Sequence, residues 1–274
     1  MTSDSSNPRY SVIVPAYNEA EWLPECLSAA REAMQAVNLE GEVVVVDNNS
    51  TDTTAEIARQ MGARVVCEPI NQISRARNAG AKAARSQYLV FVDADTRLPP
   101  PVLAEAIANL DSGECCGGGA TVAFDRPLTG LMKQLLRLWH WLAHRYGLAA
   151  GCFVYCRRDA FDAIGGFSER VFASEEVWFS RQLGRWGKQQ GKPFRLIDTQ
   201  SVVTSSRKLD HPLSVHVALL LALLFPPAVY SRRLCNVWYK RRPRLRREPS
   251  QANQDEAPQA QQSSSGHTAH EENH

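Results

Sequence analysis

Two aspartates separated by one residue follow a short apolar run, an arrangement that could bind a metal ion. Residues 88–92 are uniformly apolar and predict a buried strand, and Asp93 and Asp95 come directly after it. Side chains two residues apart on an extended backbone point the same way. Both carboxylates can therefore contact one hard divalent cation, and such a cation can hold a diphosphate. Two aspartates that only cap the next helix would show the same pattern. The neighbouring segments are therefore needed to distinguish metal binding from helix capping.

A third carboxylate, Asp47, ends the apolar run at residues 43–46. At a strand end it can accept a hydrogen bond from a nucleobase N–H or a ribose hydroxyl. The Ser- and Thr-rich residues 50–54 after it are explained by a helix N-cap alone. Arg75 and Arg77 lie close to the start of another predicted helix, where guanidinium groups and free backbone N–H groups suit phosphate oxygens. Two solvated helix arginines are the alternative.

The elements that position these residues alternate strictly along the first third of the chain. Short β-branched runs predict strands, and longer stretches between them predict helices; the strands are 11–14, 43–46, 64–67 and 89–92, and the helices 19–37, 53–61 and 75–84. This order predicts an α/β fold with a mostly parallel sheet and helices on both faces. Ligands bind beyond the carboxyl ends of such strands. The loops at 15–19, 47–50 and 93–95 should therefore converge.

The second half is less regular. A bent or antiparallel strand is expected at 115–124, an amphipathic helix at 128–146, a strand at 151–156 and a helix from Ser174 to about Gly187. On the amphipathic helix, Trp139 and Trp141 could line an acceptor groove, pack in a core or meet a membrane edge. His140 and His144 share a helix face, but without a third ligand nearby they are interpreted as surface or interface histidines.

The C-terminal third combines apolar and basic segments. Residues 212–230 carry no charge, yet their apolar run is shorter than the roughly 20 residues of a spanning helix. Eight Lys and Arg and no acid follow at 232–247. We interpret 211–247 as a membrane-associated segment, with a buried core helix as the alternative. His211 is a candidate extra metal ligand or diphosphate contact. Residues 1–9 are expected to be flexible and 248–274 disordered.

Bulk properties narrow the partners and the compartment. The net charge of +2 predicts no nucleic-acid partner. Seven cysteines without paired spacing indicate neither a disulfide framework nor a zinc site, which favours a reducing cytosol. The N-terminus shows no secretory signal pattern. We expect a cytoplasmic protein, peripheral on the inner face of the cell membrane.

Taken together, these motifs resemble the family 2 glycosyltransferases over residues 10 to 205. Six segments match that family in order and spacing: 11–19, 46–52, 77–80, 91–95, 165–167 and 175–183. Asn48 and Asn49 replace the commoner Asp-Gly, a tolerable change in a turn. The resemblance implies the GT-A fold over residues 10–210, a nucleotide-sugar donor carrying UDP or GDP, and Mn²⁺ or Mg²⁺.

Residue roles also follow from the resemblance. The nucleoside would be held by Pro15, Ala16, Tyr17, Glu19 and Asp47. Arg75 or Arg77 would approach the diphosphate, and Ala94 would belong to the donor-binding loop. Asp93 would contact ribose and metal, and Asp95 would bind the metal directly.

The acceptor's base is usually the aspartate of a Glu-Asp pair in that family, and here Glu176 takes its place. A base there would deprotonate an acceptor hydroxyl as it attacks the anomeric carbon, which inverts the configuration. Because Glu176 is one methylene longer, the adjacent Glu175 stays a second candidate. An acidic first turn after a Ser174 cap would explain both residues without catalysis. The apolar and basic C-terminal third suggests an acceptor that is lipid-linked or part of the cell envelope.

Two other functions could use part of this pattern. A haloacid-dehalogenase-type phosphatase also uses Asp-x-Asp after a strand, but it needs Thr or Val where this chain has Arg97, and it places the pair on the first strand. A non-catalytic nucleotide-sugar or membrane-binding module of the same fold is the main alternative. Asp95 and Glu176 argue against it, because neither residue is required for folding.

Overall fold

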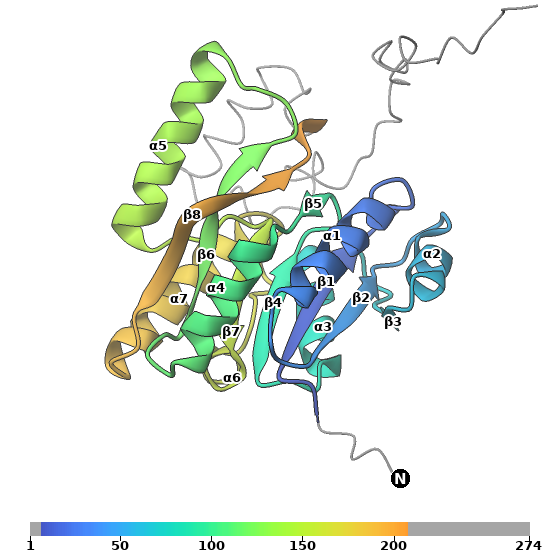
Figure 1. The fold of residues 1–274 in the computed structure, drawn as a ribbon, viewed down its shortest axis with the longest axis horizontal. Helices are drawn as coiled ribbons and strands as arrows, with labels where there is room; N and C mark the ends of the chain where they lie inside the picture. The colour runs from blue at the N-terminus through green and yellow to red at the C-terminus, as the bar shows by residue number, and fades with distance from the viewer. Residues whose placement is uncertain (1–6, 208–274) are drawn as a thin grey trace, which may run out of the picture. The chain divides into compact units, whose positions relative to one another are not determined.

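The computed structural model describes residues 7–207, which form one eight-stranded sheet with helices on both faces (Figure 1). The strands are β1 (Tyr10–Ala16), β2 (Gly41–Asp47), β3 (Arg64–Cys67), β4 (Tyr88–Val92), β5 (Thr96–Arg97), β6 (Gly117–Phe124), β7 (Phe153–Arg157) and β8 (Phe194–Thr204). The helices are α1 (Leu23–Gln35), α2 (Thr54–Gln60), α3 (Ile73–Ala83), α4 (Pro100–Asp111), α5 (Gly130–Tyr146), α6 (Arg158–Ile164) and α7 (Glu175–Gln189).

The sheet has the order β3-β2-β1-β4-β7-β6-β8-β5. β1 to β4 run parallel, as the strand–helix alternation predicts. β7 is antiparallel to both β4 and β6, whereas β8 is parallel to β6 and antiparallel to β5. The expected α/β class with a mostly parallel sheet is therefore confirmed. The antiparallel pairings fall in the second half, where the sequence predicts a less regular arrangement.

Two apolar clusters, one on each face of the sheet, hold the helices in place. One packs α1 and α4 against the central strands. The other packs α3, α6 and α7 through Phe161, Phe167 and Phe179. Gly80 lets α3 lie close to the sheet, because a Cβ there would come within 2.3 Å of the Ile13 side chain. This close contact holds the second half of α3 on the sheet, and the Gln72 N–H donates to Asn48 Oδ1 over 2.9 Å, which ties the start of α3 to the loop after β2.

Some predicted boundaries need correction. The first helix begins at Leu23 and not at residue 19, because residues 17–22 form the loop beyond β1. Arg9, assigned to a flexible N-terminus, is held by hydrogen bonds to Gln87 and Asp111. Ser174 adopts a left-handed backbone conformation and makes no side-chain cap for α7. Four elements were not predicted from the sequence: α4, α6, β5 and β8.

The expectations for residues 1–6, 208–210, 211–247 and 248–274 fall outside the described residues. Within residues 7–207, no helix combines the length and the apolar character needed to cross a bilayer.

Candidate functional site

The loops beyond β1 and β2 are joined by hydrogen bonds, as expected for parallel strands. Ala16 and Asp47 pair at the ends of the two strands. The backbone N–H of Asn18 donates to Ser50 Oγ over 2.9 Å, and that of Glu19 donates to Thr54 Oγ1 over 2.8 Å. The predicted convergence of these loops is confirmed, and it forms one wall of the candidate site.

The residues expected to hold a nucleoside differ in what they can offer. Pro15, Ala16 and Ala94 are buried, and their side chains carry no polar group. Tyr17 and Asp47 are partly exposed at the loop surface. One carboxylate oxygen of Asp47 accepts a hydrogen bond from the Ser50 N–H over 3.2 Å, which holds the side chain at the strand end.

The Asp93–Asp95 segment follows β4 and is tied to the start of β7. The Asp93 N–H donates to the Cys152 carbonyl over 3.1 Å. The Asp95 side chain is only 2% exposed, and its Oδ2 atom has no hydrogen-bond partner. That oxygen instead lies 2.8 Å from the Arg207 guanidinium, an ion pair without hydrogen-bond alignment. A buried carboxylate oxygen held only by a cation is suited to metal ligation.

Arg207 joins two carboxylates that belong to different loops. Its Nη1 and Nη2 atoms donate to the two Glu19 oxygens over 2.9 and 2.6 Å, and Nη2 also pairs with Asp95. The guanidinium lies 5.6 Å from the centre of the Trp22 ring. Although burial opposes it, these carboxylates raise the pKa of Arg207 above its ordinary value. The positively charged Arg207 guanidinium is therefore in direct contact with Asp95, the second aspartate of the pair.

The role of Arg207 was not predicted from the sequence. The position depends on strand register, because Thr204 at the end of β8 pairs with Thr96, next to Asp95. The one sequence signal is a basic residue just after a strand.

Arg77 is buried at the centre of a second ion-pair network. Nη1 donates to Glu175 over 2.6 Å, and Nη2 donates to Asp93 over 3.0 Å and to the Gly151 carbonyl over 2.6 Å. Both carboxylates act to raise the pKa of Arg77. The guanidinium therefore connects α3, the end of β4 and the start of α7. Its Nη1 and Nη2 donors are directed at protein groups, which fits a residue that positions the site, whereas the buried Nε has no hydrogen-bond partner among the described residues.

Glu176 lies in the first turn of α7, next to this network. Burial and the neighbouring Glu175 carboxylate raise its pKa to about 8, against the lowering effect of Arg77. Gly151 faces it closely: a Cβ there would lie 3.3 Å from the Glu176 carboxyl carbon. Ser180 donates its hydroxyl to the Glu176 carbonyl and accepts the Ala149 N–H, which fixes this turn. A carboxyl with a pKa near neutrality is suited to proton transfer.

Glu175 differs from its neighbour. Its side chain is 7% exposed and paired with Arg77, whereas Glu176 is half-buried. The two candidates are therefore separated by their surroundings, and Glu176 is the more accessible.

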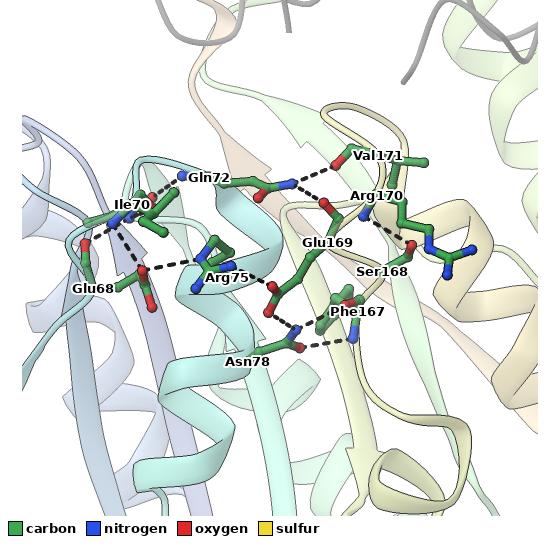
Figure 2. Close-up of polar contacts among 11 residues, drawn as sticks. Glu68, Ile70, Gln72, Arg75, Asn78, Phe167, Ser168, Glu169, Arg170 and Val171 are labelled. Atoms are coloured by element: carbon green, nitrogen blue, oxygen red, sulfur yellow. Dashed lines mark hydrogen bonds and ion pairs between the residues drawn. The ribbon is translucent and has the colours of Figure 1, made fainter. Parts of the chain in front are cut away.

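The loop before α7 is fastened onto α3, and Figure 2 shows the contacts. Asn78 donates to the Phe167 carbonyl and accepts the Phe167 N–H, both over 2.9 Å. Gln72 Nε2 donates to the carbonyls of Glu169 and Val171. This clamp fixes the segment that leads into Glu175 and Glu176.

Arg75 takes part in the same clamp. It pairs with Glu169 over 2.7 Å and with Glu68 over 3.3 Å (Figure 2). It lines an open groove of about 550 Å³ with Val66, Glu68, Asn78, Ala79, Lys82, Ala83 and Glu169. Its guanidinium is therefore engaged with carboxylates.

The two histidines of α5 are engaged separately. The Val122 N–H donates to His140 Nε2 over 3.2 Å, and His144 lies 3.9 Å from an Asp198 oxygen. Among residues 7–207, no cluster of three or more His, Cys, Asp or Glu side chains could bind a metal by itself. A cation on Asp95 would therefore need ligands from a bound molecule.

The chain was compared with known proteins. The family model for glycosyl transferase family 2 matches residues 11–165. An uncharacterized glycosyltransferase of Mycobacterium bovis is 36% identical over 133 residues, which is 48% of this chain and 53% of the relative. The dolichol-phosphate mannosyltransferase of Pyrococcus furiosus is 36% identical over 170 residues, 58% of this chain and 45% of the relative. The chain thus matches about half the length of these curated relatives.

Among solved structures, a mannosyltransferase from Pyrobaculum calidifontis in complex with GDP-Man and Mn²⁺ is similar in fold. Its TM-score is 0.59 at 21% identity, covering 85% of this chain and 70% of the other. The family model covers more than half of this chain, and its matched segment contains Asp47, Arg77, Asp93 and Asp95. The chain belongs to glycosyl transferase family 2.

Proposed function

We propose that this protein transfers a sugar from a nucleoside-diphosphate sugar to an acceptor hydroxyl, with Glu176 as the general base. The observation that carries the proposal is the position of Glu176. It lies beside the Arg77 network that also holds Asp93, and its pKa is raised to about 8. A carboxylate that only stabilises the first turn of a helix acts in its ionised form, and a raised pKa disfavours that form. The shift is therefore better explained by a role in proton transfer.

The donor would bind across the strand ends. Asp47 and Tyr17 lie at the partly exposed end of β1 and β2, where a nucleoside can be contacted. Asp93 and Asp95 lie beyond β4, the neighbouring strand, where a diphosphate would follow. Five carboxylates and two arginines surround this region, namely Glu19, Asp93, Asp95, Glu175, Glu176, Arg77 and Arg207. This acidic excess would repel a diphosphate unless a cation is present.

A divalent cation fits this donor set. Asp95 and Asp93 would hold it, and the fit is supported by the buried Asp95 Oδ2 atom, whose contact in the described residues is the positively charged Arg207 guanidinium at 2.8 Å. When bound, the cation would neutralise the charge on the departing diphosphate. Arg77 would keep the Asp93 carboxylate oriented through its 3.0 Å bond.

In the transfer itself, Glu176 would remove the proton from the acceptor hydroxyl as the oxygen attacks the anomeric carbon. The bond from that carbon to the diphosphate oxygen breaks as the new bond forms, and direct displacement of this kind inverts the configuration. Glu175 would position the site through Arg77. The raised pKa of Glu176 makes the carboxylate a stronger base than an ordinary glutamate.

A lipid phosphate is our first choice of acceptor. The Pyrococcus furiosus relative is named for dolichol phosphate, and an undecaprenyl-phosphate transferase of Enterobacter is 30% identical over 145 residues. For such an acceptor the attacking oxygen is the hydroxyl oxygen of the phosphate monoanion, and Glu176 would take that P–OH proton. We further propose that residues 211–247 bring the protein to the cytoplasmic face of the membrane, as their apolar and basic composition suggests.

The test is a panel of UDP- and GDP-sugars with short polyprenyl phosphates and with sugar acceptors, scored by released nucleoside diphosphate and by labelled product. We expect product with one donor class only, and none when Mn²⁺ and Mg²⁺ are chelated. If donors and acceptors bind but no product forms under any condition, the alternative of a non-catalytic nucleotide-sugar-binding module would replace this proposal.

A further inference from the structure

Helix α5 exposes an unusual number of large apolar side chains. Among residues 7–207, six large hydrophobic side chains are exposed, and four of them lie on α5: Leu131, Leu138, Trp141 and Tyr146. Of the 17 residues of this helix, only Ala143 is buried. Single exposed hydrophobics are common on protein surfaces, but a concentration on one helix indicates a binding surface.

Three of these side chains share one face of the helix. Leu138 is seven residues from Leu131 and three from Trp141, and both spacings place the side chains on the same side. The inner side of α5 meets the sheet instead, where the Val122 N–H of β6 donates to His140. Figure 1 shows α5 standing beside β6 and β8. The apolar stripe of Leu131, Leu138 and Trp141 is thus directed away from the sheet.

The charge of α5 identifies the kind of partner. Lys133, Arg137 and Arg145 are exposed, and the helix contains no Asp or Glu. At helical spacing, Lys133 and Arg137 lie along one side of the apolar stripe, next to Trp141, and Arg145 lies within it. A helix with an exposed apolar stripe, an exposed tryptophan and only basic charges is suited to lie in the interface of an anionic bilayer. A protein partner would need an apolar groove with acidic residues placed opposite these basic side chains. An anionic lipid surface meets the same apolar and basic side chains without such a specific arrangement.

We propose that the outer face of α5, defined by Leu131, Lys133, Arg137, Leu138 and Trp141, docks on an anionic lipid surface. The segment after α5 runs straight into the candidate site: Ala149 donates to Ser180, Gly151 accepts from Arg77 and Cys152 accepts from Asp93. Docking through α5 would hold this part of the site near the headgroups. That consequence for a lipid-linked acceptor rests on the proposed function, whereas the docking itself does not.

The test measures binding of the full chain to vesicles of phosphatidylglycerol and phosphatidylcholine, by sedimentation. We expect Leu138→Glu and the double variant Lys133→Glu/Arg137→Glu each to weaken partitioning about tenfold or more. Leu39→Glu, which changes an exposed leucine before β2, is the matched control and should bind like wild type. Quenching of tryptophan fluorescence by brominated lipids should fall clearly in Trp141→Phe, because Trp141 would lie among the acyl chains.

Unchanged partitioning of Leu138→Glu, or unchanged quenching in Trp141→Phe, would overturn the proposal. A change in oligomeric state or a lower Tm in Leu138→Glu, without a change in vesicle binding, would also overturn it, since the face would then be covered by a second copy or by the chain itself. Turnover with a short water-soluble acceptor should be the same in Leu138→Glu and wild type. Loss of vesicle binding with intact turnover thus separates docking from catalysis.

Discussion

At the scale of single residues, Glu175 and Glu176 have identical side chains, but their surroundings give them different roles. Glu175 is paired with Arg77 and buried, which suits a positioning residue. Glu176 carries no such ion pair, and burial together with the neighbouring carboxylate raises its pKa. The sequence could nominate both residues but could not separate them, because the separation depends on which one meets Arg77.

The raised pKa predicts a pH profile. Since the base must be ionised, kcat/KM should rise with pH through about 8, where half of Glu176 is ionised, and level off above about 9. The profile should be measured with a saturating concentration of metal at every pH. A flat profile over this range would argue that another group takes the proton.

Arg77 predicts a stability effect. Arg77→Met leaves Asp93 and Glu175 without their cation, and we expect a loss of about 3–5 kcal/mol in the free energy of unfolding. Urea denaturation measures it. Arg97→Met, which removes the exposed pair with Glu25, is the control and should cost less than about 1 kcal/mol. Equal losses in the two variants would contradict the assigned role of Arg77.

At the scale of elements, the parallel half was predictable because short β-branched runs alternate with helical stretches. Asp47 and Asp93 could be placed at strand ends from that pattern alone. Arg75 and Arg77 could not be placed, because their partners Glu169 and Glu175 are distant in sequence and belong to the irregular half. The resemblance located the arginine segment near the site, and the ion pairs reveal what its side chains hold.

The clamp between α3 and the loop before α7 predicts a local effect of Asn78→Ala. Without the two bonds to Phe167, the amides of residues 167–175 should exchange hydrogen faster and activity should fall, because Glu176 is less well positioned. Hydrogen-exchange mass spectrometry measures the exchange of these amides, and a turnover assay measures the activity. Asn109→Ala removes two hydrogen bonds elsewhere, to Tyr155 and Arg195, and serves as the control. Similar exchange in wild type and Asn78→Ala would show that the clamp does not hold the loop.

At the scale of the whole molecule, Arg207 joins the first and last parts of the described chain. It connects Glu19, in the loop after β1, with Asp95 from a position just beyond β8. Strand register between β5 and β8 creates this contact, and register is not readable from a single sequence. The role of Arg207 could therefore be identified only from the structure.

Because Arg207 and a metal would compete for the Asp95 oxygen, Arg207→Ala should bind Mn²⁺ roughly five- to 100-fold more tightly than wild type when no nucleotide is present. Electron paramagnetic resonance of free Mn²⁺ measures this affinity directly. Arg207→Lys keeps the charge and should stay close to wild type. Weaker Mn²⁺ binding in Arg207→Ala would show that the guanidinium supports the site and does not compete for it.

The central claim is that the cluster around Glu176 performs sugar transfer. The most direct measurement compares Glu176→Gln with wild type for both donor binding and transfer. Donor binding, measured by calorimetry with metal present, should be unchanged within about threefold, whereas the transfer rate should fall by about 100-fold or more because the proton has no acceptor. Transfer by Glu176→Gln at a rate close to that of wild type would contradict the account.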